Sequence, residues 1–449
     1  MALSIGQKAG WGLADMGINV FVVVKQLLVF AYLTTFLGVP PGIAGWLTFA
    51  ILAFDVVTDP IVGYLSDRIE TRWGRRAPWI AVGAVVLAGG IIGMFAVPDG
   101  MSWQANMGWV AVFFAIATIG FTFVAIPYGA MAGEMTQDPR ERSSMMAYRM
   151  AFASLGLLTA GAVVPALAGN TKAGYLQAMI MVAPVIILTI WGMLFFTRKA
   201  PKIPHSVTED FRAVARLVFG NGSFSVLVVL YGVLTLGVAI IAAGLQLASL
   251  YLITDDGGSP LSGLASGLGI FSTLFAMFIV GSVLSQWVWV TLSARMGKVA
   301  ALTFGMVLYI ATLLGVWAAL PAEGITVMAA LFLAAGFCNG AYQQIPWAMY
   351  PDLMDVTRNE SGAAVEGAFS AVWLFGQKVA NAIAPLVLGL ILQAAGWRES
   401  TEGVVEQTPE ALGALRMSLT LVPCAIFAVA ILGLMLIYGP RAKREAAHA

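Results

Sequence analysis

Long runs of apolar residues recur along this sequence, and each is long enough to cross a lipid bilayer. A helix needs about 20 apolar residues to span about 30 Å of hydrocarbon, and isolated strands would leave their backbone groups unpaired in lipid. We therefore expect an all-α membrane protein with about twelve transmembrane helices. The first six expected spans are residues 10–36, 44–66, 78–97, 105–131, 149–168 and 175–197. The second six are residues 224–251, 262–294, 298–318, 323–347, 361–394 and 412–438.

The composition agrees with a membrane location. Of the 449 residues, 60% are hydrophobic and 10% are charged, whereas about a quarter of the residues in a soluble domain are charged. The net charge of +1 argues against a nucleic-acid partner. Cys338 and Cys424 lie in apolar runs, and His205 and His448 lie in polar segments. We therefore expect no disulfide scaffold, zinc site or histidine-based active site, and we expect a monomer without a cofactor.

Basic residues fall mainly in alternate loops, and this pattern predicts the orientation. Loops 67–77 and 132–148 are rich in arginine, and cationic loops stay in the cytoplasm. We therefore expect a multi-pass protein of the cell (inner or plasma) membrane with both termini in the cytoplasm. The polar stretch 198–222 is the expected cytoplasmic loop between two six-helix halves, 1–197 and 223–449.

The two halves carry similar turns. LSDRIETRWGRR follows the second span, and LSARMGK follows the eighth. Repeated halves are typical of secondary transporters, in which the solute binds near the middle of the bilayer between the repeats. The sequence therefore favours a carrier over a channel.

Several ionisable residues lie inside the expected spans. Because such residues are costly in lipid, they usually face a cavity or a partner. They come from both halves: Asp15, Lys25, Asp55, Asp59, Arg149, Glu366 and Lys378. Structural ion pairing between helices is the alternative to a role in transport.

Asp55 and Asp59 form the best-defined candidate site in the sequence. Their i, i+4 spacing places both carboxylates on one helix face, where they repel each other unless a proton, a metal cation or a basic residue lies nearby. We expect a coupling cation, sodium or a proton, with further oxygen ligands from Thr58 and Thr122. Lys378 is the expected alternative partner when the cation is absent, although a structural pair between Lys378 and Glu366 is also possible.

Other polar and aromatic residues in the spans are candidates for solute contact. Lys25 would either neutralise an acidic residue or contact an anionic solute, unless the expected boundary of its span is wrong. Tyr128, Trp347 and Trp373 sit close to polar residues and are candidates for stacking on a solute, although packing is the alternative for each.

Four segments carry a resemblance to a known family. FDVVTDPIVGYLSDRIETRWGRRAPW resembles the second span and following loop of the glycoside–pentoside–hexuronide:cation symporters, which include the melibiose carrier. Three further segments resemble the same family in the same order: GWGLADMGINV, IPYGAMAGEMTQDPRERSSMMAYRMAFASLG, and PWAMYPDLMD with GAFSAVWLFGQKVA. The resemblance implies the major facilitator fold and cation-coupled symport.

The resemblance also implies roles for individual residues. Asp55 and Asp59 would bind the coupling cation with help from Thr122, and Asp15 and Arg149 would border the sugar pocket. Lys378 would link the two sites. The family's cytoplasmic loop motif is matched by Gly63, Asp67, Arg68, Gly74 and Arg75. These loop residues would form a latch that stabilises one state of the carrier.

Three positions depart from the melibiose carrier. Ala125 stands where that carrier has a sugar-binding aspartate, Gly129 where it has a sugar-stacking tryptophan, and Thr58 where it has asparagine. Melibiose is therefore an unfavourable candidate, and a uronate deserves early testing because Lys25 and Arg149 are cationic.

The AIPYGA and AYRM segments are also similar to sodium-dependent lysophospholipid carriers, so a lysolipid or other amphipathic lipid is the alternative substrate. A membrane enzyme is disfavoured because the chain lacks a histidine cluster, a phosphate-binding glycine loop and a serine elbow.

Overall fold

The protein is described here by a computed structural model that covers residues 3–69, 71–136, 138–201, 218–361 and 366–441. Its chain divides into two compact units. Unit 1 comprises Met1–Ser206 with the short segments Gly267–Ser272 and Arg398–Glu406, and unit 2 comprises the rest. The expected middle loop, 198–222, lies largely outside the described residues.

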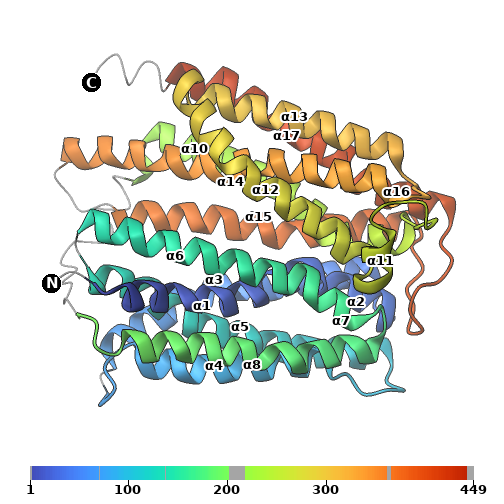
Figure 1. Ribbon diagram of the computed structural model, residues 1–449, viewed down its shortest axis with the longest axis horizontal. Coiled ribbons are helices and arrows are strands. Elements are labelled where there is room, and N and C mark those ends of the chain that lie inside the picture. Colours follow the sequence, from blue (N-terminus) through green and yellow to red (C-terminus); the bar gives the residue numbers. More distant parts are fainter. Residues whose placement is uncertain (1–2, 70, 137, 202–217, 362–365, 442–449) are drawn as a thin grey trace. The chain divides into compact units, whose positions relative to one another are not determined.

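Unit 1 is built mainly from long helices, with a few short helical segments among them (Figure 1). They are α1 (Ile5–Leu27), α2 (Val29–Phe36), α3 (Pro41–Arg68), α4 (Ala77–Phe95), α5 (Trp103–Met135), α6 (Pro139–Leu158), the π-helix η1 (Thr159–Val163), α7 (Val164–Ala168) and α8 (Lys172–Thr197). Their starts follow local chemistry, because the hydroxyls of Ser4, Ser102 and Thr171 accept backbone hydrogen bonds at the first turns of α1, α5 and α8.

Unit 2 contains most of the second set of helices. They are α10 (Gly222–Tyr251), α11 (Ser262–Leu268), α12 (Ile270–Met296), α13 (Lys298–Ala319), α14 (Ile325–Ser361), α15 (Glu366–Ala394), α16 (Pro409–Leu419), α17 (Leu421–Gly433) and the π-helix η2 (Leu434–Tyr438). The side chain of Asn221 caps α10, and that of Thr408 caps α16.

The expected number of spans is confirmed. Among the described residues, 11 helices are long and apolar enough to cross a membrane, and α1 with α2, bent by 45°, would make up to 12. The start of the fifth span and the end of the tenth were predicted wrongly: α6 begins at Pro139, so Arg149 lies inside the helix, and α14 continues to Ser361. Hydropathy detects only the part of a helix that lies in hydrocarbon, and these two helices continue through polar sequence.

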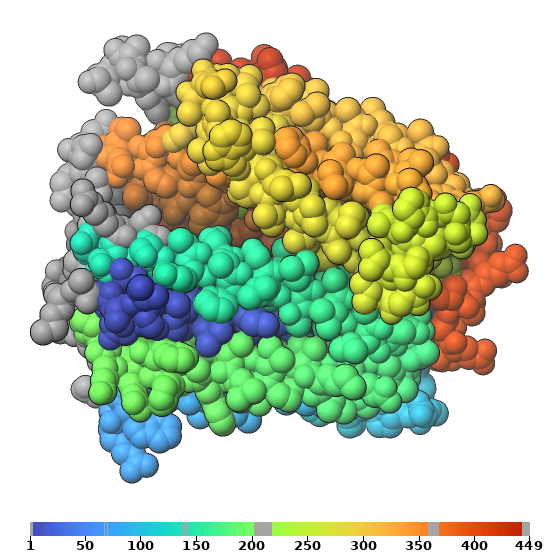
Figure 2. All heavy atoms as spheres, viewed as in Figure 1, coloured from blue at the N-terminus to red at the C-terminus, as the bar shows by residue number. Residues whose placement is uncertain are grey.

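Small residues bring the helices of unit 1 close together. A Cβ at Gly12 of α1 would lie 2.8 Å from the Arg149 backbone nitrogen in α6, and one at Gly156 would lie 2.4 Å from the Met16 carbonyl oxygen. A Cβ at Gly17 would meet the Thr189 hydroxyl of α8 at 2.6 Å. Figure 2 shows the start of α1 between α6 and α8 on the face in view. Close approach through glycine is common in membrane helices, and here it positions α1 against its neighbours.

Candidate functional site

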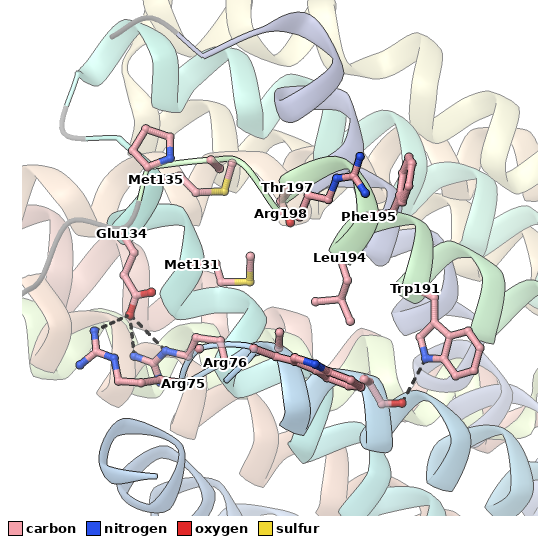
Figure 3. Close-up of a pocket in the computed structure, with 16 residues that line it drawn as sticks. Arg75, Arg76, Met131, Glu134, Met135, Trp191, Leu194, Phe195, Thr197 and Arg198 are labelled. Atoms are coloured by element: carbon pink, nitrogen blue, oxygen red, sulfur yellow. Dashed lines mark hydrogen bonds and ion pairs between the residues drawn. The ribbon is translucent and has the colours of Figure 1, made fainter. Parts of the chain in front are cut away.

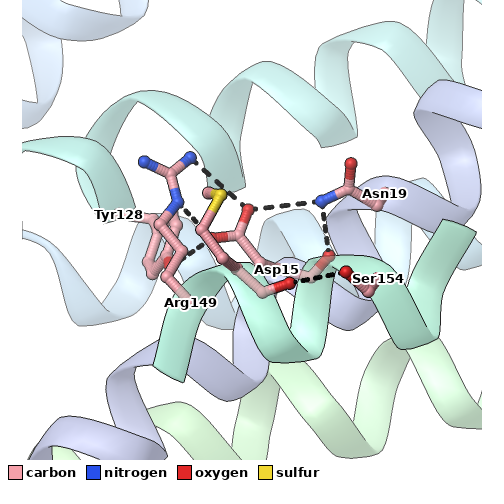
Figure 4. A network of polar contacts seen from close by, with 6 residues as sticks. Asp15, Asn19, Tyr128, Arg149 and Ser154 are labelled. Carbon is pink, nitrogen blue, oxygen red and sulfur yellow. Dashed lines mark hydrogen bonds and ion pairs between the residues drawn. The ribbon is translucent and has the colours of Figure 1, made fainter. Parts of the chain in front are cut away.

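Asp15 of α1 lies at the centre of a buried polar cluster in unit 1. The Tyr128 hydroxyl of α5 donates a hydrogen bond to Asp15 Oδ2 at 2.7 Å, and the Arg149 guanidinium of α6 pairs with the same carboxylate. The Asn19 amide donates to the Asp15 carbonyl at 2.8 Å (Figure 4). The Asp15 side chain is 3% exposed whereas that of Arg149 is 35% exposed. Arg149 is therefore the more exposed partner of this ion pair.

Two residues of this cluster were missed in the sequence analysis. Asn19 lies one turn from Asp15 in one direction, and Trp11 lies one turn away in the other. Trp11 is fully buried and stacks on Tyr128, with ring centroids 4.8 Å apart and an interplanar angle of 22°. The spacing 11, 15, 19 places all three residues on one helix face, and this signal could have revealed them.

A second buried cluster lies around Asp55 of α3. The Lys25 ammonium of α1 lies 3.8 Å from Asp55 Oδ2, and the Thr122 hydroxyl of α5 donates to Asp55 Oδ1 at 3.2 Å. The Lys25 ammonium also lies 4.8 Å from the centre of the Phe121 ring, which favours a cation. Of the two roles considered for Lys25, the structure therefore supports pairing with an acidic residue.

Asp59 and Thr58 complete the α3 part of this second cluster. Asp59 lies one helical turn from Asp55, and its Oδ1 is buried. The Thr58 hydroxyl donates to the Asp55 backbone carbonyl at 3.1 Å, so its oxygen lone pairs stay available to a cation. Within unit 1 the structure thus brings Asp55 together with Thr122 and Lys25.

The two clusters lie at different depths along α1. Asp15 and Lys25 are separated by ten residues, which corresponds to a rise of about 15 Å along an α-helix. α5 also contributes to both clusters, through Tyr128 and Thr122. Two shared helices therefore connect one polar site to the other within a single unit.

Unit 2 contributes an aromatic cluster. Trp373 of α15 is fully buried and stacks on Tyr231, with ring centroids 4.2 Å apart, and on Tyr350, at 4.9 Å. The Trp347 indole of α14 donates to the Tyr231 hydroxyl at 3.0 Å and is 40% exposed. In this structure Trp347 has surface for stacking on a solute, whereas Trp373 has none and packs behind it.

Two charged candidates belong to α15. Lys378 lies within this helix in unit 2. The side chain of Glu366, at its first residue, lies outside the described residues, so the expected pair between Glu366 and Lys378 stays a prediction.

The loop between α3 and α4 carries most of the residues that we expect to form a latch. Gly74 adopts φ +93°, a left-handed conformation that favours glycine, and its amide donates to the Thr71 carbonyl at 2.8 Å. Arg68 lies over the Tyr64 ring at 4.0 Å. The side chain of Asp67 lies outside the described residues, and Gly63 lies inside α3.

The shortest ion pair of this loop among the described residues involves two residues that the sequence analysis missed. Arg76 Nη2 lies 2.9 Å from Glu134 Oε1 at the end of α5, and Arg76 Nη1 donates to the Ser66 hydroxyl at 3.0 Å. The expected residue, Arg75, lies 3.8 Å from the same carboxylate oxygen. The loop is thus tied to the ends of α3 and α5 within unit 1.

Comparison with known families decides what kind of protein contains these clusters. The family described as MFS/sugar transport protein matches residues 10–438. The chain belongs to this family. The family inferred from the four segments is thereby confirmed, and the chain is a multi-pass membrane transporter and not an enzyme.

Relatives of this MFS transporter in Escherichia coli K12 carry symporter and carrier names. YagG, whose name provisionally describes a glycoside/cation symporter, is 27% identical over 431 residues, which cover 95% of this chain and 90% of YagG. The inner membrane symporter YicJ is 25% identical, and the match covers 88% of this chain and 84% of YicJ. The glucuronide carrier protein homolog is also 25% identical, and the match covers 94% of this chain and 90% of the homolog.

Solved structures support the fold of this MFS transporter. A bacterial homologue of the human drug peptide transporters PepT1 and PepT2 matches with a TM-score of 0.66 at 12% identity, over 98% of this chain and 99% of that one. The nucleoside transporter NupG matches with a TM-score of 0.65 at 12% identity, and the match covers 96% of this chain and 99% of NupG. The expected major facilitator fold is therefore confirmed.

Proposed function

We propose that this transporter couples the movement of one monovalent cation, sodium or a proton, to the symport of a sugar, glycoside or uronate in the inner membrane. The observation that carries the proposal is the buried cluster of Asp55 with Lys25 and Thr122, about 15 Å along α1 from the cluster around Asp15. The names of the relatives support a glycoside or uronide solute, and they do not favour the lysolipid alternative.

The carboxylates of Asp55 and Asp59 support a coupling cation. They lie one helical turn apart on α3, where their like charges repel each other. A small cation that binds between them would reduce this repulsion. The hydroxyl of Thr122 and the carboxylate oxygens are hard donors, which suit sodium, and a proton on one carboxylate would reduce the repulsion as well.

The contact of Lys25 with Asp55 gives the cation an internal competitor. When the cation is absent, the Lys25 ammonium pairs with Asp55. When the cation binds between the two carboxylates, the cation replaces part of the interaction between Lys25 and Asp55. The sequence analysis gave this role to Lys378, which stays a prediction, and the contact with Asp55 supports the same role for Lys25. Solute would bind near Arg149, and α1 and α5 would carry the effect of cation binding from one cluster to the other.

Transport by proteoliposomes tests the proposal. Sodium and proton gradients are imposed separately, and uptake of labelled glucuronide, galactoside and pentose is followed. We expect one gradient to drive accumulation by the unmodified transporter. Asp55→Asn should abolish accumulation and keep exchange of labelled for unlabelled solute, because only the coupling site is altered. Asp99→Asn is the matched control, since the Asp99 side chain is 96% exposed.

Two results would contradict the proposal. One is the absence of gradient-driven uptake across a broad panel of sugars and uronates. The other is full accumulation by the Asp55→Asn variant, which would remove the assigned cation site while leaving sugar transport intact.

A further inference from the structure

A pocket opens at one end of unit 1, where α4 begins and α5 and α8 end. Its volume is about 1100 Å³. Figure 3 shows Arg75, Arg76 and Glu134 on one side of it and Arg198 with Phe195 on another. The pocket is lined by helix termini and by the loop before α4, and its lining residue Met131 lies about one turn of α5 from Tyr128 of the Asp15 cluster.

The charged residues that line this pocket give it a positive charge. Three arginines, Arg75, Arg76 and Arg198, and one glutamate, Glu134, sum to +2. Glu134 is engaged by Arg76 at 2.9 Å and by Arg75 at 3.8 Å. Arg198 lies 4.4 Å from the Phe195 ring centre, and no carboxylate of the described residues forms an ion pair with it. The pocket therefore presents two arginine charges in excess of its carboxylate.

The remaining wall of the pocket is apolar. Met131, Leu194 and Trp191 line it, and the Trp191 indole donates to the Ala81 carbonyl at 3.1 Å. This wall continues onto an exposed apolar stretch of α8, in which Leu188 is 67% exposed. Trp191 lies in the last third of α8, and tryptophan is enriched where membrane helices approach the lipid head groups. We therefore expect the pocket to join the head-group region to the hydrocarbon.

We propose that this pocket binds one anionic phospholipid. The phosphate lies against Arg198 and Arg75, and an acyl chain lies along Leu194 and the Trp191 face. A free phosphate would satisfy the arginines and leave the apolar wall unused, whereas a lipid uses both. We expect this end of the helices to face the cytoplasm, where anionic lipids attract basic groups. The proposal holds whatever solute the transporter carries.

Lipid binding to the purified, delipidated transporter tests this assignment. Phosphatidylglycerol is titrated and its occupancy is measured by native mass spectrometry, with phosphatidylcholine and inorganic phosphate in parallel. We expect one saturable phosphatidylglycerol site, no comparable site for phosphatidylcholine, and no competition by millimolar phosphate. Arg198→Gln should weaken this binding roughly fivefold, because one interfacial arginine contributes about 1 kcal/mol to lipid attraction. Arg198→Lys should restore most of it.

Two further variants separate the pocket from the surface around it. Ala81→Phe should fill the apolar wall and lower occupancy while leaving the arginines in place. Arg72→Gln is the matched control, since Arg72 lies in the same loop and does not line the pocket. Unchanged phosphatidylglycerol affinity in both Arg198→Gln and Ala81→Phe would overturn the proposal. Equal affinity for phosphatidylcholine, or displacement of the lipid by inorganic phosphate, would overturn it as well.

Discussion

The Lys25 ammonium lies 3.8 Å from the Asp55 carboxylate, and both side chains are less than a tenth exposed. The lysine comes from α1 and the aspartate from α3, so the contact joins two membrane helices of unit 1. A fixed positive charge beside a candidate cation site is a strong electrostatic influence, because interactions between buried charges are weakly screened. Under the proposed function, this pair should influence how tightly the site holds its cation.

Replacing Lys25 by methionine should strengthen cation binding. The change keeps the side chain's length and removes the internal competitor for Asp55. We expect the apparent cation affinity, measured by calorimetry or by cation-dependent solute binding, to rise roughly tenfold or more. Uptake driven by the gradient should fall, because the ion leaves more slowly. Lys172→Met is the control, since Lys172 pairs with the exposed Asp99. Weaker cation binding by Lys25→Met would show that the lysine supports the site instead of competing in it.

Removing the Thr122 hydroxyl should weaken the cation site moderately. Thr122→Val keeps the shape and deletes the hydrogen bond to Asp55 Oδ1. A bond of this kind contributes about 0.5–1.5 kcal/mol, or about 2- to 12-fold in affinity. The titration of solute binding against sodium or proton concentration measures the change. The control is Thr34→Val, because the Thr34 hydroxyl bonds only to backbone carbonyls of its own helix. An identical shift in both variants would exclude a specific role for Thr122.

The pair of Asp15 and Arg149 should serve both folding and solute binding. Arg149→Gln leaves a buried carboxylate without its cation, which costs about 3–5 kcal/mol in comparable pairs. We expect a lower melting temperature in detergent and loss of solute binding. The double variant Asp15→Asn with Arg149→Gln should recover the melting temperature and leave solute binding lost. If the double variant also binds solute normally, the pair is structural.

Trp347 should contact the solute through its ring face. It is the exposed member of the aromatic cluster, whereas Trp373 is buried. Trp347→Ala should weaken solute binding, and Trp347→Phe should retain much of it, because stacking survives without the indole hydrogen bond to Tyr231. Affinities are compared by equilibrium binding. Trp287→Ala, at an exposed tryptophan of α12, is the control. Equal affinity of the alanine variant and the unmodified transporter would remove Trp347 from the solute site.

The sequence was sufficient to predict the number of helices and the family, because apolar runs and the motif around Asp55 are local signals. It also placed Asp55 and Thr122 in one site through the resemblance. It predicted that Lys25 could neutralise an acidic residue and did not say which one, since the identity of the partner depends on how the helices are rotated and packed. The partner of the loop arginines was missed for the same reason: Glu134 lies nearly sixty residues from Arg76, and only packing brings them together.

The glycine contacts of α1 have a consequence for movement during transport. Because the backbones of α1 and α6 touch at Gly12 and Gly156, neither helix has room to slide or turn against the other without breaking many atomic contacts. We therefore expect the two helices to move together, so that Asp15 and Arg149 keep their spacing in each state of the transporter. A solute that binds there would meet the same arrangement of charges in every state.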